Sequence, residues 1–158
     1  MVLSETLCSA YNQQIVHELF NANKYSQIES FFEDVQLPNL AKYFRKQSDD
    51  EKQHANKFIE HVNTRVGGKV TIEAIDSPNL EFSDFSSIGD IYLKAEQDTT
   101  SSIEGIYDLA LSEKSYIDLS FIQSMLFEQL EEEQSAQELS VKLKMVKDIV
   151  LFDATLGD

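Results

Sequence analysis

Residues that end helices and form turns are scarce in this sequence, which has five glycines and two prolines among 158 residues. Folds with many strands need many turns, so this scarcity favours long helices. Apolar residues also recur at the three- and four-residue spacing of a helix face. The spacing predicts an all-α chain with helices at about 4–34, 38–65, 86–114 and 116–147, and a short helix at about 149–156. We expect residues 1–158 to form a single domain, because this length is typical of one.

The breaks between these segments predict how the helices connect. The first two segments are separated by only a few residues, and so are the last two, as in helical hairpins. Residues 66–85 form a longer break that contains Gly67, Gly68 and a run of turn-forming residues at 76–79. About twenty residues of mostly non-helical chain are too many for a hairpin loop. They predict a crossover between the second and third helices of a four-helix bundle.

The charge balance restricts the partners of the chain. It has 28 acidic and 13 basic residues, a net charge of −15, which argues against nucleic acid and against anionic membranes and fits a protein that attracts cations. No apolar run approaches the roughly 20 residues that span a bilayer. The single cysteine cannot form an internal disulfide, and the first residues do not read as a secretion signal, so the cytoplasm is the expected compartment.

Each long segment places polar side chains on its apolar face, near its midpoint. Charged residues of a helix normally lie on the solvent side. The residues that break this rule are Glu18 in the first segment, Glu51 and His54 in the second, Glu96 in the third, and Gln129 and Glu132 in the fourth. Antiparallel packing of full-length helices brings their midpoints into one layer, so we expect these side chains to meet in the core.

Several buried carboxylates need a source of positive charge, because an uncompensated buried charge costs several kcal/mol. No lysine or arginine falls on these apolar faces near the midpoints, so a bound cation is the expected source. Oxygen ligands with one imidazole suit iron or manganese better than a metal that prefers thiolates. Glu51 and His54 form a Glu-x-x-His unit, whose spacing puts both side chains on one helix face.

These residues also have simpler explanations. One glutamate on an apolar stripe often reaches solvent at the edge of a bundle, and residues 131–133 alone read as a solvated acidic run. Tyr25 suits a core aromatic, His17 is interpreted as a surface residue, and His61 as a packing or surface residue. A metal-free acidic bundle that binds partner proteins is therefore one alternative.

Four motifs together resemble the non-haem ferritins of bacteria. They are HELF at 17–20 followed by Tyr25, DDEKQH at 49–54, YLKAEQ at 92–97 and FEQLEEE at 127–133. The resemblance covers nearly the whole chain, including the crossover and the short tail. It implies a ferritin-like four-helix bundle with one long crossover and a short C-terminal helix.

The resemblance also implies roles for individual residues. Glu18 and His54 correspond to ligands of a first iron, and Glu51 to a carboxylate that bridges two irons. Glu96 and Glu132 correspond to ligands of the second iron, Gln129 to a glutamine near the pair, and Tyr25 to a tyrosine beside it. A third iron site is implied at Asp50, Glu128 and Glu131.

The activity implied by the resemblance is that of a ferroxidase, which oxidises Fe(II) to Fe(III) with O₂ or H₂O₂ and stores ferric mineral inside a hollow homo-oligomer of 24 subunits. Haem is not expected, because bacterioferritins carry a haem-ligating methionine directly after the bridging glutamate, where this chain has Lys52. The alternative on the same bundle is a di-iron oxidase or peroxidase similar to rubrerythrin. The single cysteine rules out the four-cysteine module of that class.

Overall fold

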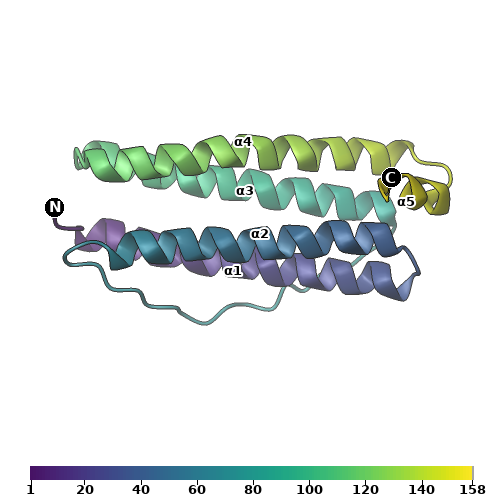
Figure 1. The fold of residues 1–158 in the computed structure, drawn as a ribbon, viewed down its shortest axis with the longest axis horizontal. Helices are drawn as coiled ribbons and strands as arrows, with labels where there is room; N and C mark the ends of the chain where they lie inside the picture. Colours follow the sequence, from purple (N-terminus) through teal and green to yellow (C-terminus); the bar gives the residue numbers. More distant parts are fainter. Residues whose placement is uncertain (158) are drawn as a thin grey trace.

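The computed structural model describes residues 1–157, which form four long helices and one short one. The helices are α1 (Glu5–Asp34), α2 (Pro38–Asn63), α3 (Phe85–Ser112), α4 (Tyr116–Met145) and α5 (Ile149–Leu156). The described residues contain no β-strand, only an isolated bridge between Val2 and Val66. The predicted all-α bundle with one long crossover is therefore confirmed (Figure 1). No helix within residues 1–157 is long and apolar enough to cross a membrane.

The starts of the helices follow from their capping residues. Ser4 caps α1, since its hydroxyl accepts a hydrogen bond from the backbone N–H of Leu7 at 3.1 Å. Pro38 occupies the first turn of α2, where its missing N–H is not needed. The α3 helix begins at Phe85, one residue earlier than predicted, because Asp84 caps it and forms a reciprocal capping box with Ser87.

Three helices end two residues before their predicted ends. The α2 helix ends at Asn63, where the chain tightens and the N–H of Arg65 bonds to the carbonyl of Val62. The α3 helix ends at Ser112 because Lys114 has a φ of 55°, which a right-handed helix cannot include. The α4 helix ends at Met145 because Val146 is extended, which turns the chain toward α5.

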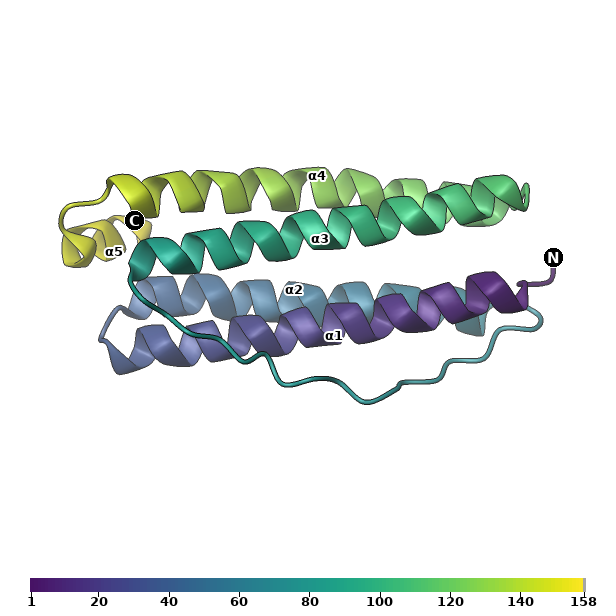
Figure 2. The same ribbon diagram turned by 180° about the vertical axis from the view of Figure 1, so that it is seen from behind.

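The helices pack as two hairpins, α1 with α2 and α3 with α4, and the crossover connects them along the outside of the bundle (Figures 1 and 2). In Figure 2 the crossover passes along α1. Its first part is held there by Asn12, whose side chain donates to the carbonyl of Lys69 at 2.9 Å and accepts from the N–H of Thr71 at 3.0 Å. Residues 69–72 of the crossover form no strand.

The apolar core consists of two clusters that lie at opposite ends of the bundle. One includes Tyr25, Phe44 and Tyr92, and the other includes Ile15 and Phe58. Along every long helix, buried polar residues occupy the interval between the two clusters: Glu18 and Asn21 in α1, Gln47, Ser48, Glu51 and His54 in α2, Glu96 and Thr99 in α3, and Gln129 in α4. The middle of the bundle is therefore a polar layer between two apolar ones, as the sequence predicted.

Candidate metal centre

The α1 helix contributes Glu18, which is fully buried. The amide nitrogen of Gln14, one helical turn earlier, donates to Oε1 of Glu18 at 2.7 Å. The side-chain carbonyl oxygen of Gln14, Oε1, in turn accepts a hydrogen bond from the hydroxyl of Ser102 in α3. The second oxygen of Glu18, Oε2, is buried and has no hydrogen-bond partner. Glu18 is thus held by one oxygen and leaves the other available to a ligand.

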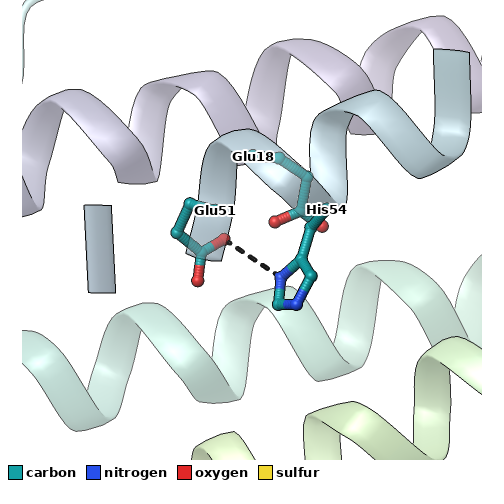
Figure 3. Close-up of side chains that lie close together, drawn as sticks. All are labelled: Glu18, Glu51 and His54. Atoms are coloured by element: carbon teal, nitrogen blue, oxygen red, sulfur yellow. Dashed lines mark ion pairs between the residues drawn. The ribbon is translucent and has the colours of Figure 1, made fainter. Parts of the chain in front are cut away.

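The α2 helix contributes Glu51 and His54, which lie on the same face (Figure 3). Nδ1 of His54 lies 3.7 Å from Oε2 of Glu51, an oxygen that is also buried without a hydrogen-bond partner. Glu18, Glu51 and His54 each offer a ligand atom, and these three atoms lie within 4.8 Å of one another. Two helices therefore present a histidine nitrogen and two carboxylates to a single point, which is a suitable donor set for a divalent cation.

Glu96 of α3 lies in the same layer, and both of its oxygens are oriented by neighbours. Oε1 accepts a hydrogen bond from the hydroxyl of Tyr25 at 2.5 Å, and Oε2 accepts one from the side-chain amide of Gln129 at 2.7 Å. Gln129 also donates to the backbone carbonyl of Glu96 at 3.0 Å. Glu132, one turn beyond Gln129 on α4, is half-buried. The second hairpin therefore brings two more carboxylates to the layer and fixes one of them.

The pKa values of the carboxylates in this layer are all raised, chiefly by burial. Burial raises the pKa of Glu18 well above its ordinary value, and the charge of Glu51 adds to the shift. Burial likewise raises the pKa values of Glu51 and Glu96. For Glu132, burial and then the charge of Glu96 raise the pKa to about 7. These shifts make each carboxylate easier to protonate, and a bound cation could replace those protons.

Within the described chain, no lysine or arginine neutralises the buried carboxylates of this layer, so a bound cation is the best source of positive charge for them. Across residues 1–157, no lysine or arginine forms an ion pair with Glu18, Glu51 or Glu96. Two carboxylate oxygens, one from Glu18 and one from Glu51, are left without a partner. Buried polar atoms in proteins are almost always paired, so these two unpaired oxygens fit a bound cation.

The acids of the implied third site are placed differently. Asp50 is paired with Lys46 at 2.6 Å, and Glu128 is paired with Lys57. Glu131 is exposed on α4. The structure does not gather these three acids into one cluster. Two of them form ion pairs with lysines, which the sequence patterns did not predict. The side chains of Lys46 and Lys57 are 71% and 43% exposed, so neither lysine lies on the buried faces that the sequence predicted to be free of basic residues.

Several polar residues of the bundle were missed or misplaced by the sequence patterns. Gln14 shares a face with Glu18 at a spacing of four, a signal that could have identified it. His17 was interpreted as a surface residue but is half-buried, with Nε2 2.8 Å from the hydroxyl of Thr99 in α3. Asp118, in the first turn of α4, is fully buried and lies 2.7 Å from Nε2 of His61.

The cluster around Asp118 is separate from the candidate centre. Its carboxylate also accepts hydrogen bonds from Tyr11 at 2.8 Å and from Arg65 at 2.7 Å. These hydrogen bonds lower the pKa of Asp118 to about 2, although its burial acts in the opposite direction. With its charge compensated by Arg65, Asp118 connects α1, α2 and α4 and does not require a metal.

Comparisons with known proteins show which family and fold this chain shares. Residues 8–146 match the family model of the ferritin-like domain. A bacterial non-heme ferritin from Staphylococcus saprophyticus is 33% identical over 132 residues, covering 84% of this chain and 78% of the relative. One from Staphylococcus haemolyticus is 30% identical over 134 residues, covering 85% and 80%. An open pore ferritin from the hyperthermophilic archaeon Archaeoglobus fulgidus matches with a TM-score of 0.93 at 28% identity, covering 98% of this chain and 97% of the archaeal one.

Proposed function

The chain belongs to the ferritin family, and from that premise we propose that it is an iron-storage ferritin that oxidises Fe(II) at a dinuclear centre in its polar layer. The observation that carries the proposal is the group formed by Glu18, Glu51 and His54, with two buried oxygens that lack partners. In this proposal iron is the substrate of the centre and the cargo of the protein.

The proposed centre has two iron positions. The first lies among Glu18, Glu51 and His54, whose ligand atoms already face one another. The second lies on the other side of Glu51, toward Glu96 and Glu132, whose charges act on Glu51. Glu51 is proposed to bridge the two irons, because Glu18 and His54 lie close to it on one side and Glu96 and Glu132 act on it from the other. Gln129 and Tyr25 hold Glu96 in place for the second iron.

The residues of the layer favour oxidation of the bound iron. Carboxylates are hard ligands that stabilise Fe(III) over Fe(II). A pair of irons supplies two electrons at once, which with two protons reduce O₂ to H₂O₂ or H₂O₂ to two waters. The raised pKa of about 7 makes Glu132 a proton carrier near neutral pH: it releases its proton when iron binds and regains it when iron leaves.

The product is proposed to accumulate as ferric mineral inside a hollow shell of 24 subunits in the cytoplasm. The net charge of −15 suits an interior that concentrates cations. A third site at Asp50, Glu128 and Glu131 would receive iron on its way to the interior, and iron would have to draw these acids together, because they do not form one cluster in the structure. Lys52, the residue directly after Glu51, is exposed and forms an ion pair with Asp49 at 3.6 Å, so no haem is proposed.

Aerobic loading with Fe(II) tests the storage function. We expect the purified protein to elute as a large assembly and to retain far more iron than its ligand sites can hold, as a dense core visible by electron microscopy. A small oligomer that consumes H₂O₂ without retaining iron would contradict storage and support the rubrerythrin-like alternative. Light scattering and iron analysis of the eluted protein give both readouts.

A further inference from the structure

Lys57 connects the candidate centre to the surface through Glu128. The ammonium group of Lys57, on α2, donates a hydrogen bond to Oε1 of Glu128, on α4. The other oxygen of Glu128, Oε2, lies 3.4 Å from Nε2 of His54 and is buried without a hydrogen-bond partner. Glu128 therefore lies between a lysine on one side and a proposed iron ligand on the other.

The exposure of these side chains increases in one direction. Glu51 is 1% exposed and His54 is 9% exposed, whereas Glu128 is 40% exposed and Lys57 is 43% exposed. The four side chains thus form a line from the buried layer to solvent, with the lysine at its outer end. An ion that leaves the first iron position along this line meets Glu128 next.

A positive charge at this point competes with a metal for the same oxygen. A lysine ammonium is a compact charge on a flexible stem, so it can hold a carboxylate and also swing away from it. Exposed ion pairs contribute little net free energy, so a divalent cation can displace the lysine. The displaced ammonium stays nearby and repels the new cation.

Building on the proposed function, we propose that Lys57 is a positioning residue that makes the outer cation site at Glu128 transient. Without iron, Lys57 holds Glu128 beside His54. Iron that moves outward displaces Lys57 and binds Glu128, and the return of Lys57 to Glu128 releases the iron. Lys46 pairs with Asp50 in a similar way, but that pair lies within one helix, whereas Lys57 reaches across from α2 to α4.

The competing explanation is that Lys57 forms an ordinary surface ion pair. In that case its removal changes the association of α2 with α4 but not the binding of a cation to Glu128. Lys57→Met separates the two explanations, because methionine keeps the length and the helix preference of lysine without its charge. Lys52→Met is the matched control, since it removes the same charge from the same helix at a residue whose one ion pair within residues 1–157 is with Asp49.

Zn²⁺ binding to the assembled apoprotein, measured by equilibrium dialysis and calorimetry, is the test. We expect a tighter class of two ions per subunit and a weaker outer ion. Lys57→Met should tighten the outer ion measurably, by up to about five-fold, the equivalent of one exposed ion pair. Lys52→Met should leave it unchanged, and Glu128→Gln in the Lys57→Met background should abolish it. An outer ion whose affinity is unaffected by Lys57→Met, or equally affected by Lys52→Met, would overturn the proposal. Absence of the two tighter ions would instead overturn the proposed dinuclear centre.

Discussion

Replacing Glu51 with alanine is expected to slow the rapid phase of Fe(II) oxidation by about 100-fold or more. Losing a residue that only supports a metal ligand typically costs 10- to 100-fold, and Glu51 is proposed to contact both irons directly. Its side chain is 1% exposed and lies between Glu18 and the second hairpin. Without it, two irons held close together would lose their shared anionic ligand.

Stopped-flow absorbance after anaerobic loading and mixing with O₂ measures this effect. Glu60→Ala is the matched control, because Glu60 lies on the same helix but is exposed. The control should oxidise Fe(II) at the rate of the unaltered protein. A rapid phase that survives in Glu51→Ala would contradict the assignment of Glu51 as a bridge.

Replacing Glu132 with alanine should slow oxidation itself by about 10-fold or more, whereas replacing Glu131 should leave the first burst intact. Glu132 is half-buried, and burial, followed by the charge of Glu96, raises its pKa to about 7. Glu131, the adjacent residue, is exposed. If Glu131 belongs to the outgoing path, its loss should affect only later turnovers, when iron must leave before new iron binds.

Repeated additions of two Fe(II) per subunit, followed kinetically, distinguish these effects. Proton release gives a second readout: at pH 6 the carboxyl of Glu132 is mostly protonated and must ionise to bind a metal. Zn²⁺ binding at pH 6 should therefore release about one proton more per subunit from the unaltered protein than from Glu132→Ala, and this difference should shrink at pH 8. Identical behaviour of the two variants would show that residues 131–133 act as a uniform acidic run.

The sequence predicted the bundle and the buried side of the layer because both depend on periodicity. A helical period fixes the face of each residue, and helix length fixes its depth. Glu18, Glu51 and Glu96 satisfied both conditions, and the structure buries all three. The crossover could be predicted from the length of the break at 66–85, because about twenty non-helical residues are too many for a hairpin loop.

The remaining features depend on how far a side chain reaches, which periodicity does not describe. Lys57 lies on α2 yet meets Glu128 on α4, because its long stem crosses the space between the helices. Asp118 reads as a favourable acid in the first turn of a helix, but packing places it beside Arg65 in the interior. Neither contact has a spacing signal, because each joins residues far apart in the sequence.

Crystals soaked with Fe(II) without oxygen, with anomalous diffraction recorded at the iron edge, test the central claim most directly. The account predicts two iron peaks per subunit in the polar layer. One peak should lie among Glu18, Glu51 and His54, and the other between Glu51, Glu96 and Glu132. Iron found only at exposed acids such as Glu131, with no peak beside Glu51, would contradict the dinuclear centre.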